Sequence, residues 1–134
     1  MRITVVGPGA VGLLFATRLA QAGAEVNLLD HRPERAAHLD QNGVLLETPE
    51  GDELHLPLKA SADPGQALAR ADLALVCVKA HQTAGVAQIL AGHLPARARA
   101  LTLQNGAGNV EALVASLGPA RVLGGITSEG STLL

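Results

Sequence analysis

Residues 2–12 read RITVVGPGAVG, and this stretch decides the fold of the chain. The five residues Arg2–Val6 are rich in β-branched side chains and stop at a glycine, which predicts a short buried strand. The next six residues form the pattern GxGxxG and lead into a helical pattern. In such a turn, Gly7 allows the tight bend, Gly9 lets a pyrophosphate approach the backbone, and Gly12 lets the helix pack close to the sheet.

The helix after this turn would direct its free N–H groups and the positive end of its dipole at the phosphates of a dinucleotide. The helix is predicted over Ala10–Ala22, with Thr17, Arg18 and Gln21 on its polar side. A close-packed turn without a ligand is the alternative interpretation of the glycine pattern. The predicted cofactor-binding loop comprises Gly7, Pro8, Gly9, Ala10, Val11 and Gly12.

Strand and helix patterns go on alternating along the rest of the chain. Asp63 and Asn109 are predicted to cap two of the helices. Ile89 and Val110 are expected on the inward sides of their helices. Strands are predicted at 25–29, 73–78, 100–103 and 121–124, and helices at 33–42, 64–70, 81–94 and 110–117.

Residues 44–58 break this alternation. Leu54, Leu56 and Leu58 alternate with His55 and Pro57, which predicts a β-hairpin with one wet face. Elsewhere, fully apolar strands alternate with helices, which indicates a parallel sheet covered on both faces. Right-handed crossovers then favour the strand order 3-2-1-4-5-6. The prediction is a single α/β domain over residues 1–134, a doubly wound, Rossmann-like parallel sheet with an inserted β-hairpin.

Composition excludes several classes of protein. The chain has 134 residues, of which 48% are hydrophobic and 16% charged, so it can bury the core of one domain and is not disordered. A net charge of −2 argues against a nucleic-acid partner. No apolar run approaches the ~20 residues of a membrane helix, and residues 1–7 do not resemble a signal peptide. We therefore expect a cytoplasmic protein without a membrane or nucleic-acid partner.

Two residues near the end of the second predicted strand bear on the choice of dinucleotide. Asp30 follows that strand at a spacing that suits a carboxylate bonded to the adenosine ribose hydroxyls, the NAD pattern. Arg32 follows two residues later, where a guanidinium could bind a 2′-phosphate, the NADP pattern. Arg32 could equally cap the next helix or lie in solvent.

The same edge of the sheet should carry two further signals. Lys79 follows the apolar strand 73–78 and would extend into the ligand crevice at the carboxyl ends of the strands, or else lie at an edge in solvent. The loop Gln104–Gly108 follows the strand 100–103. An Asn-Gly turn is its simplest explanation, but a parallel sheet has no place for a hairpin there, which favours a functional loop.

Other reactive side chains carry little signal. The only cysteine, Cys77, excludes a disulfide and alternates with inward valines, so we expect an inert core residue. The five histidines show no metal-ligand spacing, and no metal site is predicted. His81 is the one histidine expected near Lys79. No nucleophile has an evident base partner.

Three segments together resemble one family. MRITVVGPGAVG (1–12), LALVCVKAHQT (73–83) and LTLQNGAGNVEAL (101–113) are similar to ketopantoate reductases, the 2-dehydropantoate 2-reductases. The glycine motif alone fits many dehydrogenases. Lys79 after the strand 73–78, together with the QNGxG loop after the strand 100–103, is much more specific.

The resemblance implies NADPH-dependent reduction of ketopantoate, a small 2-oxo acid, to pantoate, on the way to coenzyme A. It implies that Lys79 contacts the cofactor near the reaction centre and that Asn105 helps hold the nicotinamide and the substrate. Residues 127–131 match a segment that passes close to the cofactor. Arg32 stands one residue later than the family's usual 2′-phosphate arginine, so NADP is the expected cofactor and NAD stays open.

The resemblance also implies a second, helical domain that supplies the proton-donating lysine and most substrate contacts. That domain is absent from this chain, which resembles the cofactor domain alone. We therefore expect no catalytic residue proper within it, weak cofactor binding, and slow or no turnover. A patch near Leu133 and Leu134 would then be exposed, and could support a homodimer.

Two other functions fit the same residues. The chain could be the cofactor domain of another oxidoreductase, such as a different 2-oxo or hydroxy acid dehydrogenase. It could also be a dinucleotide-sensing module without chemistry. Such a module needs the glycine loop and Asp30, but has no use for Lys79 and Asn105 beside the nicotinamide.

Overall fold

The computed structural model describes residues 1–104 and 108–127. Asn105, Leu133 and Leu134 lie outside the described residues, so the expectations placed on them stay predictions. The strands are β1 (Arg2–Val6), β2 (Glu25–Leu29), β3 (Val44–Glu47), β4 (Glu53–Leu56), β5 (Lys59–Ser61), β6 (Leu73–Val76), β7 (Arg99–Thr102) and β8 (Val122–Gly124). The helices are α1 (Ala10–Gln21), α2 (Pro33–Asn42), α3 (Pro64–Leu68), α4 (Thr83–His93) and α5 (Asn109–Leu117), with 3₁₀ turns at Ala80–Gln82 and Pro119–Arg121.

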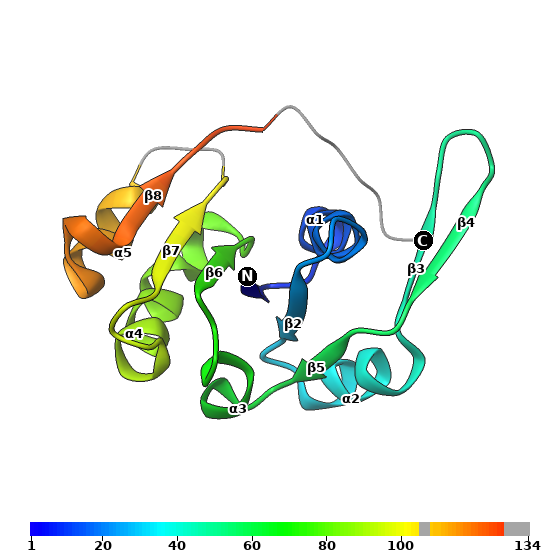
Figure 1. Cartoon of the computed structure of the whole chain (residues 1–134). Coiled ribbons are helices and arrows are strands. Elements are labelled where there is room, and N and C mark those ends of the chain that lie inside the picture. Colours follow the sequence, from blue (N-terminus) through cyan, green and yellow to red (C-terminus); the bar gives the residue numbers. More distant parts are fainter. Residues whose placement is uncertain (105–107, 128–134) are drawn as a thin grey trace.

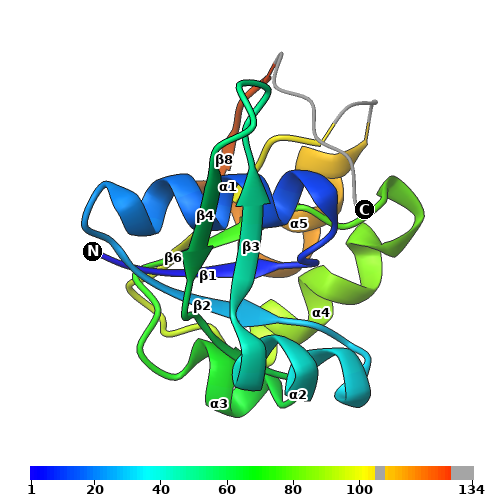
Figure 2. The ribbon, with the colours of Figure 1, turned by 90° about the vertical axis from the view of Figure 1, so that its right-hand side faces the viewer.

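Six strands form one parallel sheet in the order β5-β2-β1-β6-β7-β8. Counted along the chain within this sheet, that order is 3-2-1-4-5-6, as predicted. Helix α1 lies over one face of the sheet, and α3 and α4 lie on the opposite side (Figures 1 and 2). The fold is therefore the doubly wound, Rossmann-like α/β architecture expected from the sequence.

Alternate residues of β1 serve the two faces of the sheet. Ile3 and Val5 pack in the cluster that includes α1, whereas Val6 packs in the cluster that includes α3, α4 and α5. Buried Thr4 points to the second face, where its hydroxyl donates to the Ala67 carbonyl at 2.7 Å. Because both faces are covered, this strand is apolar nearly throughout.

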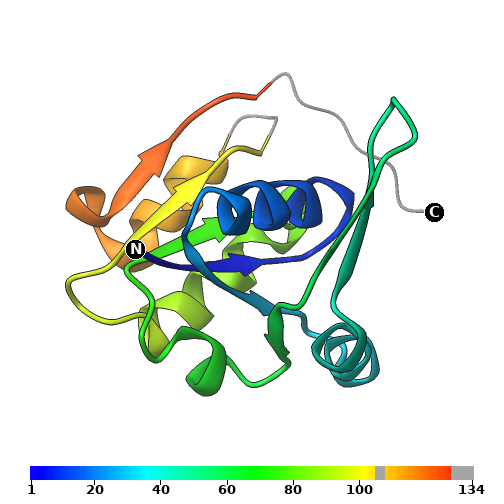
Figure 3. The same cartoon turned by 45° about the vertical axis from the view of Figure 1, so that its right-hand side comes forward.

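The predicted hairpin is confirmed, but it does not supply the third strand of the main sheet. Strands β3 and β4 pair antiparallel with each other alone, from Val44 opposite Leu56 to Glu47 opposite Glu53. The hairpin projects beyond the main sheet (Figures 1 and 3). The third position belongs to β5, which the sequence did not predict. A three-residue strand is too short for a periodicity signal, and its exposed Lys59 reads as a loop residue.

Three further expectations about the helices are wrong. Thr17 is buried rather than on the polar side of α1, because its hydroxyl donates back to the Leu13 and Leu14 carbonyls and needs no water. Ile89 and Val110 are both more than a third exposed. Asn109 is the first residue of α5 and not its cap; the cap position belongs to Gly108, which adopts φ +94°. By contrast, Asp63 caps α3 as predicted, through Gly65 N–H.

The strand register lines up the residues that matter for a ligand. Val6 pairs with Leu29 on one side and with Val76 on the other. The next residues, Gly7, Asp30 and Cys77, therefore leave the sheet together at its carboxyl edge. In a doubly wound sheet the ligand crevice lies at this edge, where the strand order reverses. In the described part of the chain, no helix has both the length and the apolar character needed to cross a bilayer.

Candidate cofactor-binding site

A cleft of about 420 Å³ opens at the carboxyl edge of β1, β2 and β6. The glycine loop forms its floor, and the residues after β2 and β6 form its two sides. The cleft therefore brings together most of the residues that the sequence singled out. Its lining comprises Gly7, Pro8, Gly9, Ala10, Val11, Asp30, His31, Arg32, Arg35, Cys77, Val78, Lys79, His81 and Gln82.

The glycine loop is built by backbone hydrogen bonds. Gly7 N–H donates to the Leu29 carbonyl at 3.1 Å, and Gly9 N–H donates to the Gly7 carbonyl at 2.8 Å. Gly7 adopts φ +83°, a left-handed conformation that favours glycine. The first intrahelical bond of α1 runs from Leu13 N–H to the Gly9 carbonyl at 2.9 Å. The loop thus folds back on β1 and β2 and starts α1 at the cleft.

The loop fits a phosphate group. A Cβ added at Gly9 would meet no atom of residues 1–104 and 108–127 within 4 Å, so these residues leave the space above Gly9 open. Gly9 is also the N-cap of α1 and offers no side chain to satisfy the first N–H groups of the helix. Unpaired N–H groups and a positive helix end beside an open space are what an anion needs. The residues present therefore accommodate the pyrophosphate of a dinucleotide.

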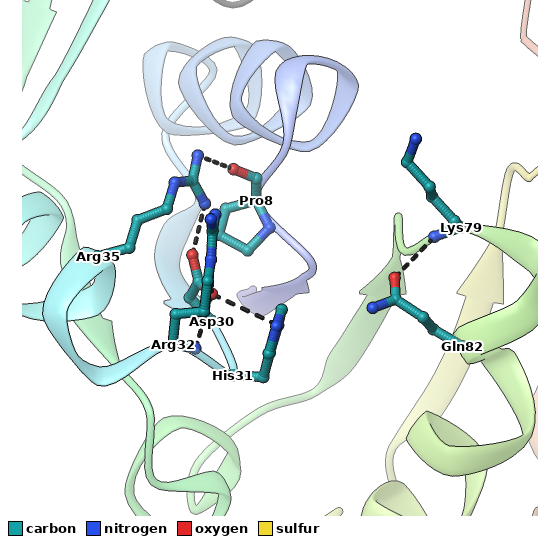
Figure 4. Close-up of polar contacts among 7 residues, drawn as sticks. All are labelled: Pro8, Asp30, His31, Arg32, Arg35, Lys79 and Gln82. Atoms are coloured by element: carbon teal, nitrogen blue, oxygen red, sulfur yellow. Dashed lines mark hydrogen bonds and ion pairs between the residues drawn. The ribbon is translucent and has the colours of Figure 1, made fainter.

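Beside this loop, Asp30 is the centre of a charged cluster. We call Asp30, His31, Arg32 and Arg35 the Asp30 cluster (Figure 4). The Asp30 carboxylate is 3% exposed. Its Oδ1 accepts from Arg32 N–H at 3.0 Å, and Arg32 Nε and His31 Nδ1 each lie 3.6 Å from the same oxygen. Its Oδ2 accepts from Arg35 Nη1 at 2.5 Å. Both carboxylate oxygens therefore have partners within the protein.

Arg35 is the residue of this cluster that sequence reasoning missed. It lies in the first turn of α2, five residues after Asp30, and its Nη2 also donates to the Pro8 carbonyl at 2.5 Å. One guanidinium thus connects the glycine loop, the end of β2 and α2. The available signal was a basic residue in the first turn of the helix that follows a strand-end acid.

The surroundings of Asp30 favour its charged form. Burial raises the pKa of Asp30, but the Arg32 N–H and the Arg35 guanidinium together lower it by more, so the pKa lies below its ordinary value of 3.8. A carboxyl whose pKa is lower in the folded state stabilises the fold above its unfolded pKa. That contribution is lost as the pH falls through the folded pKa.

We expect Asp30→Asn to lower the free energy of unfolding at pH 7 by about 2 kcal/mol. The substitution removes the buried negative charge that accepts charge-assisted hydrogen bonds. The gap to wild type should stay constant between pH 5 and 8 and shrink below about pH 4, where the wild-type carboxyl takes up a proton. Urea unfolding across this pH range measures the difference in free energy of unfolding between wild type and Asp30→Asn. Asp52→Asn in the exposed hairpin turn is the control. A gap that stays constant down to pH 3 would contradict the assignment.

A second cavity continues the cleft on the far side of the glycine loop. It has a volume of about 330 Å³ and includes Leu103, Gln104 and Thr127 in its lining. Val11, Cys77, Val78 and Lys79 line both cavities, so the two form one groove along the edge of the sheet. Exposed Lys79 stands where they meet, across the loop from the Asp30 cluster (Figure 4). Asn105, expected here too, lies outside the described residues.

Gln104 organises the segment around Lys79. Its side-chain amide donates to the Val78 carbonyl and, at 2.9 Å, to Thr83 Oγ1. Its Oε1 accepts from Thr102 Oγ1 at 2.7 Å. Thr83 in turn donates to Asn109 Oδ1 at 3.0 Å. These contacts, one buried and three partly buried, join the ends of β6 and β7 to the first turns of α4 and α5. The sequence marked the Gln104 loop, but the pairing with Thr83 and Asn109 is visible only in three dimensions.

Cys77 is not the core residue that the sequence predicted, because it is only partly buried and lines both cavities. Burial raises the pKa of the Cys77 thiol to about 11, so the thiol is protonated at neutral pH and is a poor nucleophile. His81 is exposed at the cleft beside Lys79, where the sequence placed it. Among residues 1–104 and 108–127, no group of three or more His, Cys, Asp or Glu side chains could hold a metal ion.

Comparison with known proteins agrees with this geometry. The family model for ketopantoate reductase PanE/ApbA matches residues 3–134. The 2-dehydropantoate 2-reductase of Halobacterium salinarum is 37% identical over 131 residues, which cover 98% of this chain and 43% of that protein. The chain thus spans about two fifths of the length of this relative.

Solved structures lead to the same family. A PanE/ApbA family ketopantoate reductase from Ralstonia eutropha superposes with a TM-score of 0.81 at 35% identity, covering 92% of this chain and 40% of that one. The 2-dehydropantoate 2-reductase from Geobacter metallireducens gives a TM-score of 0.80 at 32% identity, with the same two coverages. The chain therefore belongs to the ketopantoate reductase PanE/ApbA family.

Proposed function

We propose that this chain is the NADPH-binding domain of a reductase that converts 2-dehydropantoate to pantoate. One observation carries the proposal: the glycine loop, the Asp30 cluster and Lys79 line a single groove at the carboxyl edge of the sheet. A dinucleotide needs such a groove, with an anion site in the middle and different chemistry at its two ends. The similar proteins are named 2-dehydropantoate 2-reductases, and we infer the substrate from those names.

The proposal assigns each end of the groove to one half of the cofactor. The N–H groups of Ala10 and Val11, at the start of α1, bind the pyrophosphate. The Asp30 cluster holds the adenosine ribose, and Arg32, which is more than half exposed, binds the 2′-phosphate. We assign Lys79 to the nicotinamide end, and we propose the same role for Asn105, which lies outside the described residues. When bound, NADPH supplies the hydride that reduces the substrate carbonyl.

The residues of this chain then orient and stabilise rather than perform the proton transfer. As the carbonyl carbon of the 2-oxo acid gains hydride, negative charge develops on the carbonyl oxygen. The Lys79 ammonium, at the nicotinamide end, stabilises that negative charge. The other basic side chains of the groove, His31, Arg32 and Arg35, belong to the Asp30 cluster. Among the described lining residues, only His81 accompanies Lys79 at the nicotinamide end as a basic side chain. We propose that a second domain of the reductase supplies the proton and most substrate contacts, as the greater length of the relatives allows.

Titration of this chain with NADPH and NADH tests the cofactor assignment. We expect NADPH to bind at least tenfold more tightly, because Arg32 adds a charge-assisted contact to the 2′-phosphate. Arg32→Ala should reduce the preference to within about threefold. Isothermal calorimetry measures both affinities, and thermal shift gives an independent check because a ligand that binds the folded state raises its stability. Equal affinities in the wild-type chain would contradict the assignment.

Replacing Lys79 distinguishes a reductase from a dinucleotide-sensing module. In the reductase that contains this domain, we expect Lys79→Ala to lower ketopantoate turnover roughly a hundredfold, while NADPH affinity changes by less than about tenfold. Lys59→Ala is the matched control, since Lys59 is exposed on edge strand β5 and does not line the groove. Turnover equal to that of the control would favour the sensing module, and Asn105→Ala should repeat the result.

A further inference from the structure

Arg35 makes contacts that cofactor binding as proposed above does not require. Its side chain is 22% exposed, although it sits beside an open cleft. The two ends of its guanidinium are used on different partners, Asp30 Oδ2 and the Pro8 carbonyl. Figure 4 shows Arg35 reaching from α2 across Asp30 to the glycine loop. The guanidinium is thus committed to the protein rather than extended to solvent.

The charges of the cluster decide which ribose substituent it accepts. Asp30 contributes one negative charge, and Arg32 and Arg35 contribute one positive charge each, so the cluster is net positive with His31 neutral. Without Arg35 the net charge would be zero, and Asp30 Oδ2 would lose its partner. A positive cluster attracts a 2′-phosphate, whereas a bare carboxylate repels it and instead accepts hydrogen bonds from the two ribose hydroxyls.

The geometry around Asp30 restricts the access of a ribose hydroxyl to its carboxylate. Oδ2 accepts from Arg35, Oδ1 accepts from the Arg32 N–H, and the carboxylate is almost fully buried. Each oxygen keeps a further lone pair, but with the side chain only 3% exposed a ribose hydroxyl has little access to it. In this chain, a strand-end acid, the usual mark of an NAD site, is therefore engaged inside the protein.

We propose that Arg35 is a specificity-determining residue that neutralises Asp30 and so makes this site select a dinucleotide with a 2′-phosphate. The inference rests on the proposed function, since it presumes that the chain binds NADP(H). Arg35 acts through Asp30, and the phosphate itself is bound by Arg32. The Arg35–Asp30 ion pair also explains how Asp30 and Arg32 coexist in one site, although in the sequence they indicate opposite cofactors.

The test measures the affinities of NADPH and NADH for this chain by calorimetry in four variants. In Arg35→Gln, the freed carboxylate should lower the ratio of NADPH to NADH affinity at least tenfold relative to wild type. In the double variant Asp30→Asn/Arg35→Gln, no carboxylate remains, and the ratio should return to within threefold of wild type. Arg35→Lys keeps the charge and should keep the ratio. Arg18→Gln, on the exposed side of α1, is the surface control.

Each alternative result has its own meaning. An unchanged ratio in Arg35→Gln would overturn the inference alone, provided that wild type binds NADPH. A double variant that stays as poor as Arg35→Gln would overturn it as well, because Arg35 would then bind the phosphate directly. Wild type that binds neither cofactor would overturn the proposed function and the inference together. If Arg35→Gln does not fold, Asp30→Asn decides: a fall in its ratio contradicts the inference, and an equal or higher ratio supports it.

Discussion

Gly9→Ala is expected to remove dinucleotide binding and leave the fold intact. In the protein, a Cβ at this position meets no atom within 4 Å, and the backbone angles of φ −77° and ψ −161° are open to any residue. The same open space is where the pyrophosphate must approach the N–H groups of α1. A methyl group there would hold the phosphates away from those donors. We expect NADPH affinity to fall roughly a hundredfold.

The fold should tolerate this change because its costs and gains nearly cancel. Alanine is a poorer N-cap than glycine, which costs about 0.5–1 kcal/mol of stability. It also restricts the unfolded chain, which returns about 0.4–1 kcal/mol. Gly85→Ala in α4 is the matched control, since its Cβ also meets open space but lies away from the groove. Calorimetry with NADPH and urea unfolding separate binding from stability; wild-type affinity in Gly9→Ala would contradict the placement of the phosphates.

Gly12→Ala is expected to have the opposite effect and to damage the fold itself. A Cβ at Gly12 would lie 2.6 Å from the Gly7 carbonyl oxygen, 3.3 Å from Val5 Cγ1 and 3.4 Å from Cys77 Cβ. The first of these contacts is with backbone that cannot turn aside. Helix α1 would have to move away from β1, and such overpacking of a buried contact costs about 3 kcal/mol. The intrinsic helix preference of alanine over glycine, about 1 kcal/mol, offsets only part of this.

Urea unfolding measures this loss as a fall in the midpoint at constant m-value. For a domain of this size, a net loss of about 2 kcal/mol corresponds to a decrease of roughly 8 °C in Tm. Gly85→Ala again serves as the control and should be slightly more stable than wild type. A Gly12→Ala variant as stable as wild type would show that α1 can relax on the sheet.

Together these two variants separate the roles that the sequence assigned to the motif. The turn at Gly7 is confirmed by its φ of +83° and by Val78, whose atoms leave no room for a Cβ. The packing role of Gly12 is confirmed because a Cβ there would lie 2.6 Å from the Gly7 carbonyl oxygen and 3.3 Å from Val5 Cγ1 of β1. The role of Gly9 stays a prediction until a ligand is measured, although the open space above it is what that role requires.

Much of the fold was open to prediction because its signals are local. The strands β1, β2 and β6 are short apolar runs that stop at a glycine, an acid or a polar turn, and the chirality of the crossovers leaves few ways to order them. The exceptions are residues whose environment depends on a distant partner. Edge strand β5 pairs only with β2 and also depends on Asp40 of α2, which accepts from Ala60 N–H. Asn109 is buried against Thr83 of another helix.

The sequence by itself determined the parallel sheet, the glycine turn and the expectation that Gly7, Asp30 and Lys79 share one edge. These follow from hydrophobic periodicity, from backbone conformations available only to glycine, and from the common direction of parallel strands. Only the tertiary structure decided that Arg35 forms an ion pair with Asp30 and that the Gln104 side chain joins the end of β6 to α4. Such pairings depend on side chains from separate segments meeting within about 3 Å, and nothing in local spacing specifies that meeting.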